Sequence, residues 1–184
     1  MTQVRDFTAE LRNALRVEDV PHGAVPVVDD SRRARAEYST DASNYRVVPE
    51  VVVLPRHTDE VLAALEVARA HQVPITTRGG GTSIAGNAVG PGMVIDFSRH
   101  LNSIVDIDPE ARTARVQPGV IMTDLQQAAA PHGLRFGPDP SSQSRATIGG
   151  MIGNNACGPH AMSLGRTADN TRSLQVVDGT GRIF

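Results

Sequence analysis

The stretch Arg78-Gly79-Gly80-Gly81-Thr82-Ser83-Ile84-Ala85-Gly86-Asn87 decides the fold, because it directly follows residues 73–77, which predict a strand. Three consecutive glycines are costly to order. Glycine lacks a Cβ, so successive backbone N–H groups can converge on one point and form an anion-binding nest. Two hydroxyl side chains and one arginine in the stretch add donors suited to phosphate. We therefore predict a phosphate-binding loop at the carboxyl end of a strand.

Two better-known phosphate loops do not fit this stretch. The spacing from Gly81 to Gly86 is that of a Walker A loop, but Asn87 and Ala88 stand where that loop needs lysine and serine or threonine. A dinucleotide-binding fingerprint needs a third glycine at Ile84. All 18 basic residues are arginine, which also excludes a Schiff-base lysine for pyridoxal phosphate. A flexible turn is the remaining plain alternative.

The segment before the loop predicts a compact βαβ unit. Residues 50–54 are an apolar run between two prolines, as in a short buried strand. A helix follows, with Thr58 as its expected N-cap and His71 at its end. Residues 50–78 therefore predict two parallel strands joined by a helix. The expected apolar face of this helix consists of Val61, Leu62, Leu65 and Ala68.

Residues 1–37 predict an N-terminal helical extension and a linker. Apolar residues at positions 4, 7, 11 and 15 recur at helical spacing and indicate an amphipathic helix. Residues 21–30 contain proline, glycine and paired aspartates, and we interpret them as a linker. Residues 31–37 predict a short charged helix whose arginines form a solvated face.

Residues 91–184 predict a mixed or antiparallel sheet with covering helices. We expect strands at residues 93–97, 104–108 and 113–117, the last two joined as a hairpin, and a helix at 123–130. A further strand at 171–177 and a turn at 178–181 are followed by a return strand that has barely begun at Phe184. The fold class is α+β, and we expect the chain to end inside a domain.

A second segment, residues 137–158, combines a proline-braced loop with small and polar residues. Its paired serines and paired asparagines offer hydrogen bonds to a diphosphate or a flat ring edge, and its two central glycines allow close backbone approach. Thr147 alternatively caps a helix that begins at Ile148. For any single residue here, ligand contact and a structural turn both remain open.

Composition excludes several partners. A net charge of −2 and a pI near 6.3 give no basic field for nucleic acid. The first residues are too charged for a signal peptide, and no apolar run is long enough to cross a membrane, so we expect a cytoplasmic protein without a membrane span. A single Cys157 excludes an internal disulfide and a cysteine-based metal site, and we predict no metal.

Five motifs in this order resemble one flavoprotein family, the FAD-binding PCMH type (vanillyl-alcohol oxidase/p-cresol methylhydroxylase). They are Tyr38-Ser-Thr-Asp-Ala-Ser-Asn-Tyr45, Arg78-Gly-Gly-Gly-Thr-Ser83, Arg115-Val-Gln-Pro-Gly119, Pro138-Asp-Pro-Ser-Ser142 and Ile148-Gly-Gly-Met-Ile-Gly-Asn-Asn155. The resemblance covers residues 38–184. It implies a PCMH-type FAD-binding domain with a βαβ lobe at 50–90, an incomplete second lobe at 91–184, and FAD between the two lobes.

The resemblance implies FAD bound non-covalently. In the family, the cysteine that links flavin lies near Ala146 or Thr147, which cannot form such a link, so we expect no link through Cys157 or His160. The predicted cofactor-binding residues come from both segments: Arg78, Gly79, Gly80, Gly81, Thr82, Ser83, Gly86, Asn87, Pro138, Ser141, Ser142, Thr147, Gly149, Gly150, Asn154 and Asn155.

The motifs are most similar to FAD-linked D-lactate, glycolate and D-2-hydroxyglutarate dehydrogenases, including long forms with an iron-sulfur half. This implies oxidation of a 2-hydroxy acid by hydride transfer to flavin N5, with catalytic residues beyond residue 184. An alternative is a non-catalytic FAD- or nucleotide-binding module that acts with a partner chain. A third possibility is the related reductase of cell-wall precursors, which uses NADPH with FAD, but it lacks the Pro138-Asp-Pro-Ser-Ser142 motif.

Overall fold

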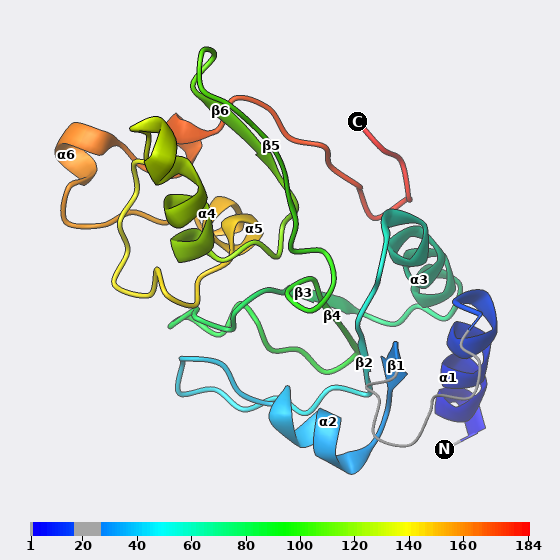
Figure 1. The fold of residues 1–184 in the computed structure, drawn as a ribbon. Coiled ribbons are helices and arrows are strands. Elements are labelled where there is room, and N and C mark those ends of the chain that lie inside the picture. The colour runs from blue at the N-terminus through cyan, green and yellow to red at the C-terminus, as the bar shows by residue number, and fades with distance from the viewer. Residues whose placement is uncertain (1, 17–26) are drawn as a thin grey trace.

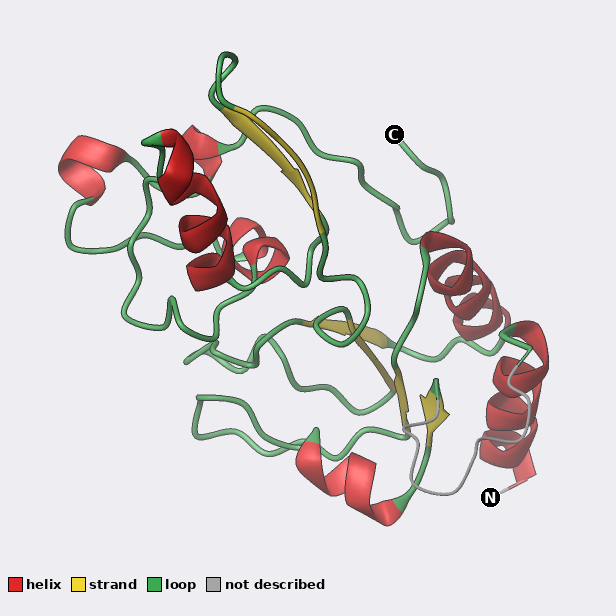
Figure 2. Cartoon of the chain, viewed as in Figure 1, coloured by secondary structure: helices red, strands yellow, loops and turns green. Residues whose placement is uncertain are grey.

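The computed structural model describes residues 2–16 and 27–184, and it has two lobes (Figure 1). The first lobe is built on a four-stranded sheet and the second on a two-stranded hairpin. Figure 2 shows that loops, rather than helices or strands, fill the region between the lobes. The α+β fold class predicted from the sequence is confirmed.

The first sheet has the strand order β1-β2-β4-β3. Strand β4 is parallel to both β2 and β3, whereas β1 pairs antiparallel with β2. The predicted parallel βαβ unit is therefore present, with β4 inserted between its two strands. The strands are β1 (Val28–Asp29), β2 (Val51–Val53), β3 (Ile75–Arg78) and β4 (Met93–Asp96).

Strand β4 corrects the predicted boundary between the lobes. We expected residues 93–97 to open the second lobe, but all four residues of β4 are buried in the middle of the first sheet. A continuous apolar run suits a strand with neighbours on both edges and helices on both faces. The boundary predicted at residues 90 and 91 therefore falls too early.

Helices cover both faces of the first sheet. Val51 and Val53 of β2 belong to the core formed with helices α1 and α3, which contact each other along one face. Val52 points to the opposite face and packs against Ala34 of helix α2. The alternation of side chains along a strand explains this division. The helices of this lobe are α1 (Thr2–Ala14), α2 (Arg32–Glu37) and α3 (Thr58–Ala70).

The N-terminal residues are part of this lobe. Phe7, Leu11 and Leu15 are buried in its core, as the helical spacing predicted. Part of the predicted linker is the strand β1, and residues 21–26 of it lie outside the described residues. Two residues are too few for a strand to be recognised from its pattern; pairing with β2 defines β1.

Helix α3 begins differently from the prediction. Its N-cap is His57, not Thr58, and makes no side-chain capping bond. Buried Glu60 instead accepts a hydrogen bond from the backbone N–H of Arg56 at 2.6 Å and pairs with the Arg56 guanidinium. Hydrogen bonds and charge from Arg56 hold the pKa of Glu60 below its ordinary value, although burial raises it. The acidic side chain thus closes this helix end, as a capping hydroxyl does elsewhere.

The second lobe packs two helices against the hairpin. Val120, Met122 and Leu125 form one core with Ile148 and Met151, and Ile104 and Val116 of the hairpin cover it. The predicted hairpin and helix are confirmed. None of the described helices is long and apolar enough to cross a bilayer. The elements are β5 (Ile104–Asp108), β6 (Thr113–Val116), α4 (Met122–Ala129), α5 (Ile148–Gly153), α6 (Ala161–Leu164), and 3-10 turns at Ala130–His132 and Ala168–Asn170.

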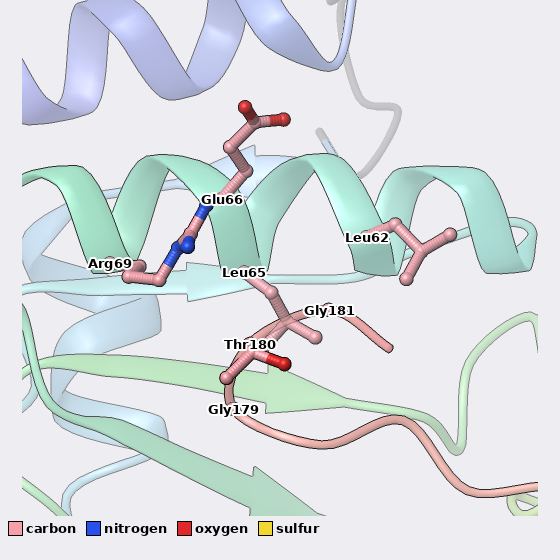
Figure 3. A pocket seen from close by; sticks show the side chains of 7 residues that line it. All are labelled: Leu62, Leu65, Glu66, Arg69, Gly179, Thr180 and Gly181. Carbon is pink, nitrogen blue, oxygen red and sulfur yellow. The ribbon is translucent and has the colours of Figure 1, made fainter. Parts of the chain in front are cut away.

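The C-terminal segment returns to the first lobe. The predicted turn at 178–181 lies beside α3 and bounds a hollow of about 230 Å³ with Leu62 and Leu65 (Figure 3). The predicted strand at 171–177 is present only at its end, where Val176 and Phe184 exchange two backbone hydrogen bonds around the turn and an isolated bridge joins Val177 to Ile183. An extended segment becomes a strand only beside a partner, and among the described residues 171–175 have no such partner.

The position of β4 predicts how the fold responds to a small cavity. Replacing Val94, which is fully buried, with alanine should lower the free energy of unfolding by about 2 kcal/mol. The same change at Val105, 58% exposed on β5, should cost less than about 0.5 kcal/mol. Urea unfolding followed by circular dichroism measures both. Equal losses would contradict the central place of β4.

Candidate functional site

The two glycine-bearing segments meet in space. A Cβ on Gly79 would lie 2.0 Å from Oγ1 of Thr147, and a Cβ on Gly80 would lie 2.0 Å from the carbonyl oxygen of Arg145. Asn87 Nδ2 donates a hydrogen bond to Asn154 Oδ1 at 3.1 Å. The loop after β3 therefore rests against the segment that leads into α5, so that both predicted segments border one site.

The glycine loop presents unused hydrogen-bond donors. The backbone amides of residues 80–84 have no hydrogen-bond partner within the described part of the chain. Gly81 adopts a positive φ of 62°, which turns the backbone where a side chain would be strained. Ser83 Oγ accepts bonds from the amides of Ala85 and Asn87 and closes the end of the loop. Five consecutive free donors at the end of a strand match the predicted anion nest.

Arg78 holds the loop in shape. Its Nη1 donates to the carbonyl oxygens of Thr40 at 2.8 Å and of Ala88 at 3.2 Å, and its guanidinium lies 5.0 Å from the ring centre of Tyr38. It also lies against Gly81, where a Cβ would come within 2.5 Å of Nη2. These contacts use the guanidinium inside the protein. Contact of Arg78 with a cofactor remains a prediction.

Residues 38–45 support the loop from the other side. The amide of Ala42 donates to the Gly81 carbonyl at 3.0 Å, and Asp41 accepts from the amide of Ala88 at 3.2 Å. Burial raises the pKa of Asp41, but hydrogen bonds from Ser43 and Ala88 outweigh it and hold that pKa below its ordinary value. The sequence matched this motif to the family without assigning its residues to the site.

The partly buried Tyr38 and the buried Asp96 form a hydrogen-bonded pair beside the glycine loop. The Tyr38 hydroxyl donates to Asp96 Oδ2 at 2.5 Å, and the amide of Ser98 donates to Oδ1 at 2.7 Å. Burial and the bond to Asp96 raise the pKa of Tyr38 well above its ordinary value. Asp96 is only 4% exposed, so these donors satisfy a carboxylate that lies largely away from water.

A cleft of about 400 Å³ lies at the carboxyl ends of β3 and β4, where the second lobe meets the first. The sequence did not single out Asp96, Ser98 or Arg99, because no motif contains them. They reach the site through the pairing of β4 with β3, which strand patterns do not reveal. The lining consists of Tyr38, Arg78, Gly79, Gly80, Asp96, Ser98, Arg99, Ile121, Arg145 and Thr147.

The structure gives several residues of the second segment structural partners. Thr147 caps α5 by accepting from the amide of Gly150 at 3.3 Å, which confirms the capping alternative. Gly149 packs against Pro118, where a Cβ would lie 2.7 Å from its Cβ. Asn155 accepts from the amide of Ala168 at 3.0 Å. Contact of the cofactor with these residues, and with Pro138, Ser141 and Ser142, remains a prediction.

A second pair ties this segment together. Asp139 accepts a hydrogen bond from Nδ1 of His160, and a Cβ on Gly158 would lie 2.1 Å from Asp139 Oδ1. The hydrogen bond from His160 holds the pKa of Asp139 below its usual range against the effect of desolvation. His160 therefore anchors the loop, and Cys157 is exposed nearby without a described partner.

The fold and the site together define a nucleotide-binding α+β protein with an anion-binding loop between two lobes. The family model described as "FAD binding domain" matches residues 49–184. The chain therefore belongs to the FAD-binding family of PCMH type, and FAD is its cofactor. This confirms the family resemblance inferred from the five motifs.

Two curated proteins are similar to this chain in sequence. The chain is 42% identical over 159 residues to glycolate oxidase subunit GlcD of Bacillus subtilis (strain 168), a match covering 85% of this chain and 34% of the relative. It is 40% identical over 146 residues to D-2-hydroxyglutarate dehydrogenase of Escherichia coli (strain K12), covering 78% of this chain and 14% of the relative. The chain thus spans about a third or less of these curated relatives.

Solved structures share the fold. An alkyldihydroxyacetonephosphate synthase superposes with a TM-score of 0.81 at 24% identity, covering 96% of this chain and 34% of that one. A variant of Physcomitrella patens BBE-like 1 superposes with a TM-score of 0.76 at 20% identity, covering 95% and 37%. At this identity the likeness concerns the arrangement of the elements alone.

The residues of the site fit the pyrophosphate of FAD. The free amides of residues 80–84 offer donors, and three of the arginines lie in the cleft lining. Anions are bound by such backbone nests without a lysine. The site therefore suits the group that the family binds, in agreement with the absence of lysine from the sequence.

The contact between Gly80 and Arg145 predicts the effect of one methyl group. Gly80→Ala should displace the loop, because its Cβ has no room beside the Arg145 carbonyl, and FAD should no longer remain bound through desalting. Gly153→Ala is the matched control, since no atom lies within 4 Å of that Cβ. Flavin absorbance of the desalted protein measures both. Equal flavin content in folded Gly80→Ala would contradict the close contact.

The Tyr38–Asp96 bond predicts an alkaline limit of stability. Tyr38 stays protonated in the fold, so its contribution is complete below its ordinary pKa of about 10 and is lost as pH rises above that value. Tyr38→Phe should cost about 1–3 kcal/mol at pH 7 and flatten this alkaline loss. Urea unfolding between pH 7 and about pH 11 tests it. Tyr45→Phe, at a 62% exposed ring, should change the pH 7 value little.

Proposed function

We propose that this chain binds the pyrophosphate of FAD on the loop at residues 79–83, non-covalently, as part of an oxidoreductase that oxidises a 2-hydroxy acid. The observation that carries the proposal is the row of free amides at residues 80–84 beside the inter-lobe cleft. No other group of the loop is as well placed to receive an anion, because Arg78 and Ser83 are used internally.

The chain's own residues would hold and orient the cofactor. The amides donate to phosphate oxygens, and Thr82 adds a hydroxyl with no partner in the described residues. The bond from Asn87 to Asn154 and the packing of Gly79 on Thr147 keep both walls of the cleft at a fixed separation. Bound FAD would supply a hydride acceptor, flavin N5, for the carbinol carbon of the substrate.

The substrate class comes from the relatives. Two of them are named for glycolate and for D-2-hydroxyglutarate, both 2-hydroxy acids, and we extend that class to this chain. The base that removes the hydroxyl proton and the clamp for the carboxylate would lie in the part of the relatives that this chain does not match. An iron-sulfur half or partner chain and a cytoplasmic location belong to the same proposal.

One observation favours the alternative of FAD binding without turnover. Asp96 is the only carboxylate in the described cleft lining, and both of its oxygens accept hydrogen bonds. The histidine in contact with Asp139 does not line the cleft. The described cleft lining thus provides a binding site and no free base, so that a second chain or segment would have to supply one.

Flavin binding is measured most directly on the 184-residue chain. After incubation with FAD and desalting, the protein should show the visible flavin spectrum, and acid precipitation should release all of the flavin into the supernatant. Flavin in the precipitate would contradict non-covalent binding. A folded chain that retains no FAD would contradict the proposed pyrophosphate site. Bleaching of bound flavin by D-lactate, glycolate or D-2-hydroxyglutarate would decide between turnover and binding alone.

A further inference from the structure

Three arginines line the inter-lobe cleft: Arg78, Arg99 and Arg145. A pyrophosphate placed on the loop amides brings negative charge into a partly enclosed space, where a nearby cation stabilises it more than in bulk water. Which of the three arginines supplies this positive charge therefore affects how tightly the pyrophosphate is bound. The three arginines differ in whether their guanidinium groups already have partners inside the protein.

Two of the three are engaged elsewhere. Arg78 donates to two backbone carbonyls and lies against the ring of Tyr38, so moving it toward a ligand would break the loop's own support. Arg99 lies close enough to the Tyr38 hydroxyl to act on its pKa. Burial and Asp96 raise the pKa of Tyr38, and Arg99 opposes them.

Arg145 is different because its backbone is fixed and its side chain is free. Its amide donates to the Ser142 carbonyl at 2.8 Å, and its own carbonyl lies against Gly80. It is exposed, and its guanidinium has no partner in the described part of the chain. A flexible cation is thus anchored beside the middle glycine of the anion-binding loop.

We propose that Arg145 supplies the positive charge that binds the FAD pyrophosphate, and that it makes the site favour FAD over flavins without phosphate. The inference rests on the proposed function, since it needs FAD on the glycine loop. From the sequence we assigned this positive charge to Arg78, whereas the proposal assigns it to a residue outside the glycine loop. Arg78 then shapes the nest, and Arg145 completes it from the second lobe.

The test compares the wild-type chain with Arg145→Gln, Arg145→Lys and Arg172→Gln. Arg172→Gln is the control. Arg172 is exposed, lies outside the cleft lining and has no described partner, and its replacement changes the net charge by the same amount as Arg145→Gln. Dissociation constants for FAD and for riboflavin, from quenching of flavin fluorescence, are measured at low ionic strength and at about 0.5 M salt.

We expect Arg145→Gln to weaken FAD binding about 10-fold at low salt and to leave riboflavin binding unchanged, because a charge-assisted contact to phosphate is lost. The difference should shrink at high salt. Arg145→Lys should retain most of the affinity, and Arg172→Gln all of it. If Arg145→Gln does not fold, as judged by circular dichroism, the wild type still decides: its FAD affinity should fall with salt.

The opposite results overturn the inference. Unchanged FAD affinity in Arg145→Gln, equal losses for FAD and riboflavin, or a wild-type affinity that ignores salt would each remove the role of Arg145 and leave FAD binding intact. Failure of the folded wild type to bind FAD would overturn this inference together with the proposed function.

Discussion

The site depends on the close packing of two glycines against the second lobe. Gly79 and Gly80 meet Thr147 and Arg145 at distances that leave no room for a Cβ. The lobes share no strand pairing among the described residues, so this contact and the Asn87–Asn154 bond set the width of the cleft between them. The three glycines of the loop therefore have separate tasks. Two allow close approach, and Gly81 turns the chain at a positive φ.

The loop also needs support from within its own lobe. Arg78 joins the carbonyls of Thr40 and Ala88, which lie far apart in sequence, and residues 38–45 hold the loop through Asp41 and Ala42. A row of amides without partners is unfavourable unless the backbone is over-determined in this way. The motif at 38–45 thus belongs to the site, although none of its side chains is required to contact the cofactor.

Particular residues show how far the sequence predicts this arrangement. Periodicity located α1, α3 and α4, and glycine chemistry located the loop, because both are local properties. Strand order is not local, so the insertion of β4 between β2 and β3 could not be derived, and neither could the presence of Asp96 and Arg99 in the cleft. The strand expected at 171–177 formed only at its end for a related reason, since residues 171–175 have no partner strand in the described part of the chain. Arg78 looked like a ligand for phosphate because a sequence does not reveal which cations are used by nearby carbonyls.

The charge of the cleft explains how a chain with a net charge of −2 and no lysine can bind an anion. Three arginines and one aspartate line the cleft, which gives it a local positive charge opposite to that of the whole chain. Asp96 would oppose a dianionic pyrophosphate, but the Tyr38 hydroxyl and the Ser98 amide take up both of its oxygens. Hydrogen bonds of this kind spread the carboxylate charge over fixed dipoles. Arg78 is bound to carbonyls and Arg99 lies beside Tyr38, so among the described residues the cleft arginine without a partner, Arg145, lies on the second lobe, opposite the amides of the glycine loop.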